Sequence, residues 1–376
     1  MSETLRDAAE GTSDVVQEAD VRASLARVEH PELHVPITDL GMVQGVLVGQ
    51  GRVQLSVASL VRGDLSREHL RAEIVRAVQV LGVDDVVVDF TTMSDTDRAA
   101  LRRRLQQQVP PSASFASTRV FLVASGKGGV GKSSVTANLA LSIAHRGKRV
   151  AVIDADVYGF SIPRMLGIDR QPLIIDGLLV PPEIEEVAVV SVGFFTDEGT
   201  PVIWRGAMLH KMLQQFVDDV WWGQPDVLLV DMPPGTGDVS LTIGQLFPDA
   251  EVVVVTTPQP AAQQVAQRAA YMAQRINLQV AGVVENMSWF TDDDGTRYDI
   301  FGTGGGQLLA TELGVPLVGQ VPLVPALRQG CDVGTPIVVA DPAGEASTAL
   351  ELIADRLLAL HPSKIHRPEL RILDTR

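Results

Sequence analysis

The chain has 376 residues, which is enough for two domains or for one large α/β domain with an appendage. It carries 46 acidic and 31 basic residues, and its formal net charge of −15 argues against non-specific binding to nucleic acid or to an anionic membrane surface. The single cysteine, Cys331, excludes a disulfide framework and any metal site built from several cysteines of one chain.

Residues 1–20 are polar, acidic and poor in aromatic side chains, which predicts a disordered lead-in. They lack a basic segment followed by an apolar stretch, so they do not have the pattern of a secretory signal. No apolar run elsewhere is long enough to cross a membrane. We therefore expect a cytoplasmic protein whose partners are neither nucleic acid nor membrane.

Residues 21–105 have the pattern of a small α+β domain. Leu70, Ile74 and Leu81 recur at helical spacing, and two valine-rich runs are joined by a glycine-containing hairpin signal. The predicted elements are helices over residues 21–28 and 66–81 and strands over residues 43–48, 53–57 and 83–90.

A linker is predicted over residues 106–117, where glutamine, proline and serine dominate. It follows a charged helix that ends near Arg102, Arg103 and Arg104. These arginines could contact nucleic acid, but the solvated end of a helix is the favoured interpretation, because positive charge suits the C-terminal end of the helix dipole.

Residues 118–361 alternate between short apolar strands and helices. The strands are rich in valine and apolar throughout, which is typical of a parallel sheet covered by helices on both faces. We therefore predict a doubly wound α/β fold with a mostly parallel sheet of about seven or eight strands. The predicted strands cover residues 120–124, 150–153, 227–230, 252–255, 280–284, 316–321 and 337–339, and the predicted helices cover residues 133–145, 209–220, 239–246, 261–276 and 343–360. The tail over residues 362–376 is basic and contains proline, and its fold stays open.

A phosphate-binding loop is predicted between the first strand and the first helix of this region, where residues 126–133 match G-x-x-x-x-G-K-[ST]. The glycines let backbone N–H groups approach a polyphosphate, Lys132 would reach the β- and γ-phosphates, and Ser133 would bind magnesium. A glycine-rich turn that binds nothing is the alternative, and the flanking strand and helix argue against it. The predicted nucleotide-binding residues of the loop are Gly126, Lys127, Gly128, Gly129, Val130, Gly131, Lys132, Ser133 and Ser134.

Acidic residues follow several predicted strands, at the edge of the sheet where ligands bind in this fold class. Asp231 ends a strand and is predicted to hold magnesium together with Ser133. Asp154 and Asp156 follow another strand, and we expect Asp156 to position the attacking water. Gly235 would let the backbone approach the γ-phosphate. Each aspartate alone could be a helix cap or a turn former, but their joint occurrence at strand ends favours the catalytic interpretation.

The loop, which includes the additional Lys127, resembles the deviant phosphate loop of the MinD/ParA/nitrogenase-iron-protein class of dimerising ATPases. A second, narrower resemblance, to the Mrp/ApbC family of iron–sulfur cluster carrier ATPases, covers residues 120–360. The further motifs that carry it lie at residues 154–167, 204–206, 231–238 and 285–288. The N-terminal region resembles the small SufT-like assembly domain through residues 39–43, while residues 58–63 replace its usual cysteine-bearing loop.

The resemblance implies an ATP-hydrolysing homodimer that sandwiches nucleotide at its interface and delivers iron–sulfur clusters to apoproteins. Lys127 would then reach the phosphates bound to the partner subunit and stabilise the transition state, as an arginine finger does. Asn286 would recognise adenine, and a cluster would bridge the subunits. The implied cofactors are ATP and magnesium, and the cluster is implied by the resemblance alone.

Members of this family usually carry a Cys-x-x-Cys pair shortly after the last of these motifs. Residues 289–298 contain no cysteine, and Cys331 supplies at most two thiolates per dimer, so the sequence identifies no set of cluster ligands. Residues 292–294 are three aspartates and are expected to form an exposed turn rather than a site for a hard metal. His145 and His210 lie on predicted helices and are expected to be surface or capping residues.

Two other functions stay open at this point. A spatial-organiser switch of the MinD or ParA kind would need a basic amphipathic terminal helix or a basic DNA-binding face, whereas prolines interrupt residues 361–368 and the chain is acidic. An ATP-dependent amide-forming ligase could share the loop, but no sequence feature marks its substrate pocket.

Overall fold

The computed structural model describes residues 16–49, 51–60, 66–109, 115–157, 159–196, 206–235 and 238–360. The chain forms two compact units, of which the first comprises residues 1–108 and 175–177 and the second comprises residues 109–174 and 178–376. Most of the predicted lead-in and the whole predicted tail over residues 362–376 lie outside the described residues.

Helix α1 (Glu18–Leu25) begins inside the stretch that the sequence predicts to be a disordered lead-in, so the predicted boundary at residue 20 is wrong. The Asp20 carboxylate accepts a hydrogen bond from the Gln17 N–H at 2.9 Å and satisfies a donor at the start of the helix. Val21 and Leu25 are buried, and the acidic side chains form the solvated side of the same helix.

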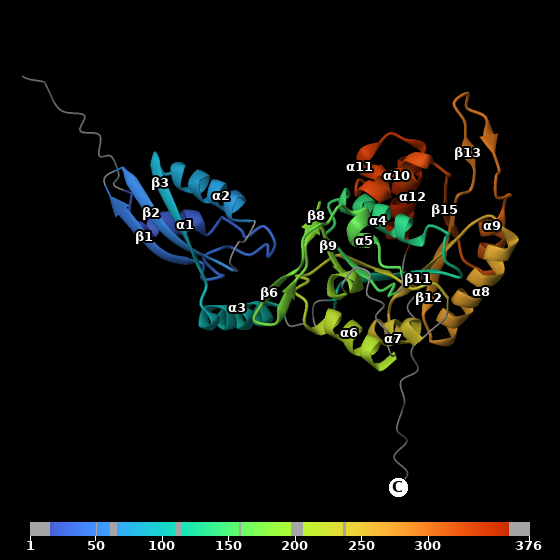
Figure 1. Ribbon diagram of the computed structural model, residues 1–376, viewed down its shortest axis with the longest axis horizontal. Coiled ribbons are helices and arrows are strands. Elements are labelled where there is room, and N and C mark those ends of the chain that lie inside the picture. Colours follow the sequence, from blue (N-terminus) through green and yellow to red (C-terminus); the bar gives the residue numbers. More distant parts are fainter. Residues whose placement is uncertain are drawn as a thin grey trace, which may run out of the picture. The chain divides into compact units, whose positions relative to one another are not determined.

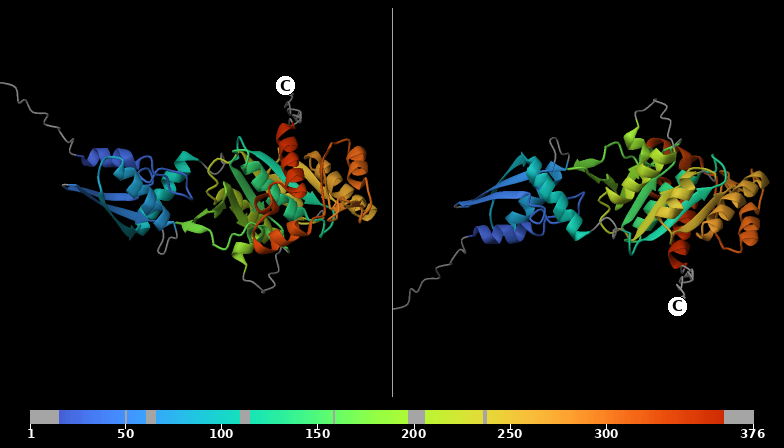
Figure 2. Two further views of the ribbon diagram at one scale, coloured as in Figure 1. Left: turned by 90° about the horizontal axis from the view of Figure 1, so that it is seen from above. Right: turned by 90° about the horizontal axis from the view of Figure 1, so that it is seen from below.

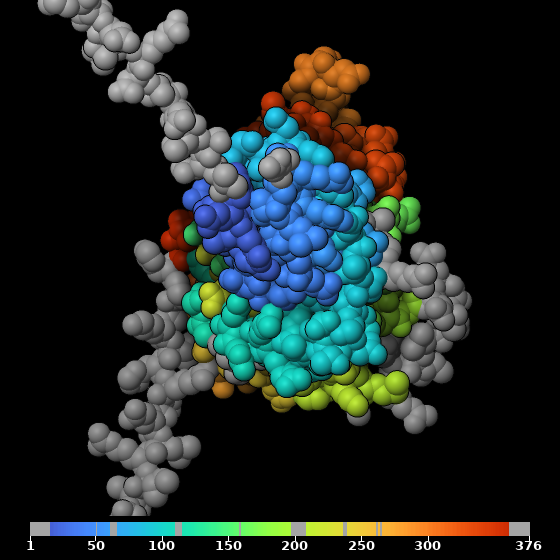
Figure 3. All heavy atoms as spheres, turned by 90° about the vertical axis from the view of Figure 1, so that its left-hand side faces the viewer, coloured from blue at the N-terminus to red at the C-terminus, as the bar shows by residue number. Residues whose placement is uncertain are grey.

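The N-terminal unit is built on a three-stranded sheet in the order β1-β2-β3. The strands are β1 (Val43–Gly49), β2 (Arg52–Ser59) and β3 (Asp85–Thr92), and the helices that follow α1 are α2 (Arg67–Gln79) and α3 (Asp95–Gln108). β1 pairs with β2 antiparallel through the predicted hairpin, and α2 connects β2 to the parallel strand β3. Leu55, Leu70 and Ile74 are fully or almost fully buried. Figure 3 shows the outer surface of this unit in blue to cyan.

Helix α3 extends to Gln108, so the predicted start of the linker at residue 106 is also wrong. Leu101 and Leu105 are buried along one side of α3, and the glutamines that follow them favour a helix. Nothing in the sequence stops the helix before Pro110.

The C-terminal unit contains an eight-stranded sheet in the order β15-β12-β11-β4-β10-β5-β9-β8, and most of these strands are labelled in Figure 1. Neighbouring strands are parallel except for the edge strand β8, which is antiparallel to β9, and the predicted doubly wound fold is confirmed. The strands of this sheet are β4 (Arg119–Ser125), β5 (Val150–Asp154), β8 (Glu183–Ile184), β9 (Val187–Ser191), β10 (Val227–Asp231), β11 (Glu251–Thr256), β12 (Gln279–Asn286) and β15 (Leu317–Val321). Two small hairpins join β6 (Leu173–Ile175) to β7 (Leu178–Val180) and β13 (Phe290–Thr291) to β14 (Arg297–Tyr298).

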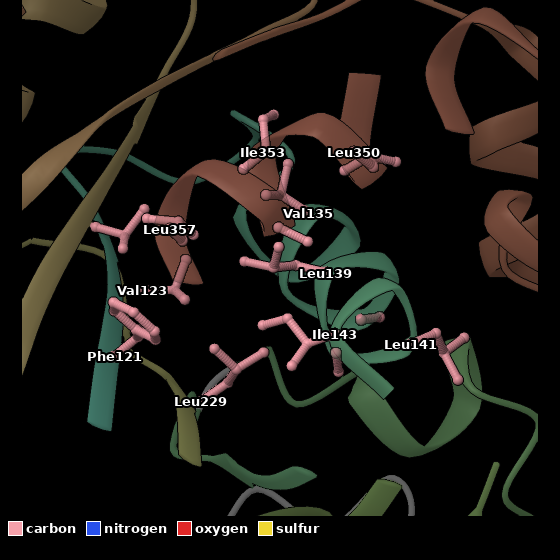
Figure 4. Close-up of a cluster of buried hydrophobic side chains, with 14 of the residues drawn as sticks. Phe121, Val123, Val135, Leu139, Leu141, Ile143, Leu229, Leu350, Ile353 and Leu357 are labelled. Carbon is pink, nitrogen blue, oxygen red and sulfur yellow. The ribbon is translucent and has the colours of Figure 1, made fainter. Parts of the chain in front are cut away.

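Helices cover both faces of this sheet, as the two views of Figure 2 show. One face packs against α4 (Lys132–Ala144), α5 (Ile162–Met165), α10 (Pro325–Val333), α11 (Ile337–Ala340) and α12 (Glu345–Ala359), and the other packs against α6 (Gly206–Asp218), α7 (Asp238–Leu246), α8 (Pro260–Arg275) and α9 (Gly305–Leu313). Phe121 and Val123 of β4 belong to the first core, which Figure 4 shows beneath α4 and α12, whereas Leu122 belongs to the second. Successive side chains of β4 point to opposite faces of the sheet, and both faces are covered by helices. The strands are therefore apolar at every position.

The predicted strand over residues 337–339 is instead the short helix α11, which follows the N-cap Pro336. Proline fixes its own backbone torsion and favours the start of a helix. The two remaining places in the sheet belong to β9 and β8. Sequence reasoning missed both, although residues 187–190 of β9 form an apolar run. In the described part of the chain, no helix has the length and apolar character that would let it cross a membrane.

Candidate nucleotide-binding site

The predicted phosphate loop connects β4, which ends at Ser125, to α4, which begins at Lys132. Gly129 and Gly131 have φ angles of 80° and 79°, in the left-handed region that favours glycine. Gly131 is the N-cap of α4, so the loop leads directly into the positive end of a 13-residue helix. Backbone N–H groups at such a helix start bind anions, and a phosphate group fits this position.

The glycines of the loop serve two different purposes. A Cβ atom at Gly126 would lie 2.2 Å from the backbone nitrogen of Ala266 in α8, so this glycine is required by close packing of the loop on a helix. A Cβ atom at Gly128 would meet no heavy atom within 4 Å. The space beside Gly128 and Gly129 is therefore open, as a cradle for a polyphosphate requires.

The Asp231 carboxylate at the end of β10 accepts hydrogen bonds from polar side chains at the start of α4. Its Oδ2 accepts hydrogen bonds from Lys132 Nζ at 2.7 Å and from Ser133 Oγ at 2.6 Å, and its Oδ1 accepts one from Thr136 Oγ1 at 2.7 Å. The Asp231 side chain is fully buried. The two predicted magnesium ligands, Ser133 and Asp231, thus lie together beside the lysine that is predicted to bind phosphate. Sequence reasoning missed Thr136, although it lies on α4 one turn after Lys132.

Asp154 lies opposite Asp231 in the register of the adjacent strands β5 and β10. Its Oδ2 accepts hydrogen bonds from the N–H groups of Ser161 and Ile162 and from Ser191 Oγ, at 3.0 to 3.2 Å. Burial, together with the negative charge of Asp231, raises the pKa of Asp154 to about 7. Asp154 therefore anchors the segment that carries Asp156 and does not itself point to solvent.

Asp156 contributes the second carboxylate near Lys132, after Asp231, since its Oδ2 lies 3.8 Å from Lys132 Nζ. Its Oδ1 accepts a hydrogen bond from the Gly159 N–H at 3.1 Å, which closes a turn after β5. One ammonium group is thus shared between carboxylates that come from two strand ends. Lys132 and Asp156 are both buried but not fully, so the space beside them is reachable.

The remaining predicted residues lie around the same loop. Lys127 Nζ lies 3.3 Å from Gln259 Oε1, and the Gly235 N–H donates to the Ser125 carbonyl at 3.0 Å with a φ angle of 92° at Gly235. The carbonyl of Ser134 accepts a hydrogen bond from Asn138 at 2.8 Å.

Asn286 lies against the loop as well. Its Nδ2 donates to the Val130 carbonyl at 2.9 Å, and a Cβ atom at Gly131 would meet that nitrogen at 2.2 Å. Its neighbour Glu285 belongs to the motif over residues 285–288, but the sequence predicts no role for it. It accepts hydrogen bonds from Ser288 Oγ at 2.9 Å, from Gln320 Nε2 at 2.7 Å and from the N–H of Gly306. Glu285 thereby fixes the turn after β12 that sets Asn286 against the loop.

These side chains suit a nucleotide with magnesium. The hydroxyl of Ser133 and the carboxylate of Asp231 are hard oxygen donors of the kind that magnesium prefers, and Lys132 supplies the positive charge for phosphate. The open space at Gly128 lies beside them in the loop. The residues present therefore fit the two cofactors that the sequence implies.

Comparison with known proteins places the chain in a family. The family model described as "NUBPL iron-transfer P-loop NTPase" matches residues 116–358, and the model described as "Iron-sulfur cluster assembly protein" matches residues 18–90. The chain is 46% identical over 360 residues to the iron–sulfur cluster carrier protein of Mycobacterium tuberculosis. The match covers 92% of this chain and 94% of the relative. The chain belongs to the iron-transfer P-loop NTPase family. The corresponding carrier protein of Bacillus subtilis is 40% identical over 313 residues, with 82% of this chain and 89% of the relative covered.

Solved structures agree with the fold. The nucleotide-binding protein of Archaeoglobus fulgidus in complex with ADP has a TM-score of 0.54 and 33% identity, and the match covers 62% of this chain and 93% of that chain. The cell division ATPase MinD of Pyrococcus furiosus has a TM-score of 0.50 at 22% identity over 65% of this chain and 99% of that chain, and this likeness concerns the fold alone. Both sequence resemblances, to the carrier ATPases and to the small assembly domain, are confirmed.

The chain's own side chains do not match the donor set of an iron–sulfur cluster. Cys331 is buried in α10, where the Asn138 Nδ2 lies 3.9 Å from its sulfur, and burial raises the pKa of its thiol. Residues 292–295 form the expected turn, at the tip of the β13–β14 hairpin, with Asp293 and Asp294 exposed. Among the described residues, no group of three or more His, Cys, Asp and Glu side chains is arranged to hold a metal ion.

The two histidines are surface residues, as expected. His145 follows the end of α4 and lies 3.3 Å from carboxylate oxygens of both Glu185 and Glu351. The Nδ1 of His210 on α6 lies 3.4 Å from Thr242 Oγ1.

Proposed function

We propose that the protein binds and hydrolyses ATP as a nucleotide-sandwich homodimer in the cytoplasm and couples this cycle to the delivery or assembly of iron–sulfur clusters for apoproteins. The observation that carries the ATPase part is the contact of Lys132, Ser133 and Asp231 at the end of a phosphate loop with open space beside it. The support for the delivery part is the family, whose curated members include proteins named iron–sulfur cluster carrier protein.

In this proposal Lys132 exchanges one anionic partner for another. Its ammonium group now donates to Asp231, and nucleotide would offer it the β- and γ-phosphate oxygens. Ser133 and Asp231 are then free to hold magnesium, which supplies charge neutralisation at the phosphates when bound. The N–H groups of the loop bind and orient the phosphates at the start of α4.

Asp156 is the proposed partner of the attacking water. Its carboxylate lies on the Lys132 side of the site and can accept a hydrogen bond from a water held in line with the γ-phosphate. Asn286 is proposed to recognise adenine. Its hydrogen bond to the Val130 carbonyl holds it against the phosphate loop. Lys127 is proposed to act on the nucleotide of the partner subunit.

The test is magnesium-dependent ATP hydrolysis by the full-length chain. We expect Lys132→Ala to lower the rate by about a hundredfold or more, because the variant loses the charge that stabilises the transferring phosphate. Lys148→Ala is the matched control, since Lys148 is exposed and its Nζ lies 4.0 Å from Asp226. Hydrolysis that is equal in the wild type and Lys132→Ala would contradict the proposal.

A further inference from the structure

We infer that the iron–sulfur cluster handled by this chain is held throughout by cysteine thiolates of another protein, and that the chain acts on that protein instead of ligating the cluster. The inference rests on the proposed function, because it concerns how the proposed delivery occurs. Three independent features of the chain carry it: the number of its cysteines, the surroundings of Cys331 and the chemistry of its other donor groups.

The first feature is the number of cysteine thiolates that the chain can supply. Iron–sulfur clusters are as a rule held by about four cysteine thiolates. The whole sequence contains one cysteine, so two copies in a symmetric dimer supply two. Even a dimer that brought both sulfur atoms together would leave half of the ligand positions to other donors.

The second feature is where Cys331 lies. The residue is 4% exposed on α10 and faces α4, where Ser134 and Asn138 are its hydrogen-bonding neighbours. The adjacent Gly330 is packed so closely that a Cβ atom there would lie 2.4 Å from the Thr335 carbonyl. The sulfur therefore cannot reach a cluster shared between two copies unless α10 leaves its place on α4.

The third feature is the chemistry of the remaining donors. The turn between β13 and β14 offers carboxylates, which are hard ligands, whereas cluster iron is bound by soft sulfur. The Asp292 carboxylate is already engaged by the N–H groups of Asp294 and Thr296, at 3.2 and 2.9 Å, within its own turn. His145 follows the end of α4 and His210 lies on α6, and each has a partner from another element. No set of side chains in the described part of the chain replaces the missing thiolates.

The transfer that follows is a ligand exchange between two other proteins. At each iron, a thiol of the recipient loses its proton and forms an iron–sulfur bond, while the thiolate of the donor leaves and takes up a proton. No electron is gained or lost in this exchange. The partner is therefore a protein that presents a cluster on its own thiolates, and the role left to the ATPase is to bind or reposition it.

The experiment uses the full-length wild type, Cys331→Ala and, in case the alanine variant does not fold, Cys331→Ser. Each protein is incubated anaerobically with ferrous iron and sulfide and desalted, and iron, sulfide and visible charge-transfer absorption are measured per dimer. Transfer from a cluster-loaded scaffold protein to an apo-ferredoxin is then followed with ATP. We expect no retained cluster in any variant and transfer rates within about twofold of the wild type for both Cys331 variants, because Cys331 is not a ligand.

A stoichiometric cluster on the wild type that is lost in the Cys331 variants would overturn the inference while leaving the proposed function intact. Lys132→Ala separates the two claims, because the proposed function requires that it abolish the ATP-dependent part of the transfer. If ATP and Lys132 have no effect on transfer, the proposed function fails and the inference fails with it. Equal transfer when a cluster bound to glutathione replaces the scaffold protein would overturn the claim that the thiolates belong to a protein.

Discussion

At the scale of single residues, the hydroxyl of Thr136 has two acceptors within reach. Oγ1 lies 2.7 Å from Asp231 Oδ1 and 2.9 Å from the Lys132 carbonyl, and a hydroxyl donates only one proton. The bond to the charged oxygen is the stronger of the two. Thr136 therefore holds the carboxylate oxygen opposite the one bonded by Lys132 and Ser133, and it can keep Asp231 in place when these two residues turn to nucleotide and magnesium.

We expect Thr136→Val to raise the magnesium concentration needed for half-maximal ATP hydrolysis, by about fivefold or more, because a buried acceptor on Asp231 loses its donor. Thr136→Ser keeps the hydroxyl and should restore the wild-type magnesium dependence. Titration of the ATPase rate with magnesium at fixed ATP checks this. Identical titrations for the valine and serine variants would show that the hydroxyl has no part in holding Asp231.

Asp154 makes the stability of the nucleotide-free protein depend on pH. Its pKa is raised from 3.8 to about 7, so the folded protein binds this proton more tightly than the unfolded chain does. The free energy of unfolding should therefore fall as the pH rises from about 4 to about 7, with Asp231 as the neighbouring charge, and level off above that window. Asp154→Asn cannot lose a proton and should lack this part of the dependence.

Chemical denaturation of the wild type and Asp154→Asn at several pH values measures the effect. Between about pH 4 and pH 7, the free energy of unfolding of Asp154→Asn should rise relative to that of the wild type by at most about 4 kcal/mol. Titrating groups that do not interact with Asp154 are common to the two proteins and cancel in the difference. Parallel pH profiles would mean that Asp154 has an ordinary pKa in the folded state.

At the scale of elements, Arg119 joins two strands and a helix. It lies where the parallel strands begin, at the end of the sheet opposite the nucleotide site. Its Nε and Nη2 lie 2.7 and 3.1 Å from the carboxylate oxygens of Glu251 at the start of β11, and its Nη1 donates to the Leu357 carbonyl of α12 at 2.8 Å. The guanidinium also lies over the Phe121 ring, 4.6 Å from its centroid. The first residue of β4 is thus fixed to its neighbour strand and to the last helix.

We expect Arg119→Met to lower the free energy of unfolding by about 3 kcal/mol, because Glu251 would be left buried without its partner. The double variant Arg119→Met/Glu251→Gln should cost less than the single variant, since it removes the uncompensated charge. Arg76→Ala is the matched control, because the Arg76–Glu73 pair is exposed and should contribute less than about 1 kcal/mol. A double variant that is less stable than Arg119→Met would contradict the role assigned to the charge.

The elements that could be predicted from the sequence are those with strong local signals. The buried strands around Phe121, Val152 and Leu229 are continuous apolar runs, and the phosphate loop has a fixed spacing of glycines and lysine. Residues 187–191 carried the same apolar signal, but the two residues before them, Glu185 and Glu186, adopt positive φ angles that no simple turn pattern predicts. The sequence therefore does not predict this strand, and it wrongly predicts a strand over residues 337–339, which form α11.

The site was predictable where a side chain follows a strand and unpredictable where it depends on packing. Asp231 and Asp154 could be found because parallel strands bring their carboxyl ends to one edge. The contact of Asn286 with the loop, the anchoring role of Glu285 and the bond from Thr136 depend on distances across the fold. No spacing within the sequence encodes those distances.

At the scale of the whole molecule, the main prediction concerns which subunit's Lys127 acts in each nucleotide site. Within one chain Lys127 Nζ lies 3.3 Å from Gln259, so its side chain is partly held at the side of the loop. If the lysine acts across a two-fold interface, each site needs Lys132 from one subunit and Lys127 from the other. The two requirements can then be separated by mixing variants.

We expect Lys127→Ala and Lys132→Ala each to lack ATPase activity. An equal mixture should recover about one quarter of the wild-type rate, because half of the dimers are mixed and each mixed dimer has one complete site. Light scattering establishes that the mixed species is a dimer. If Lys127 acts within its own chain, no site in the mixture is complete, and the rate stays at the level of the single variants.

The contrast between Gly126 and Gly128 has a consequence for how such a chain can evolve. The backbone of α8 prevents any side chain at Gly126, so this glycine would persist in a descendant that had lost nucleotide binding, as long as the fold survived. Gly128 has open space around it and a φ angle outside the left-handed region, so the fold alone would let it drift to alanine or serine. Among descendants of this chain, a residue other than glycine at position 128 would be an early sign that the loop is no longer selected for binding ATP.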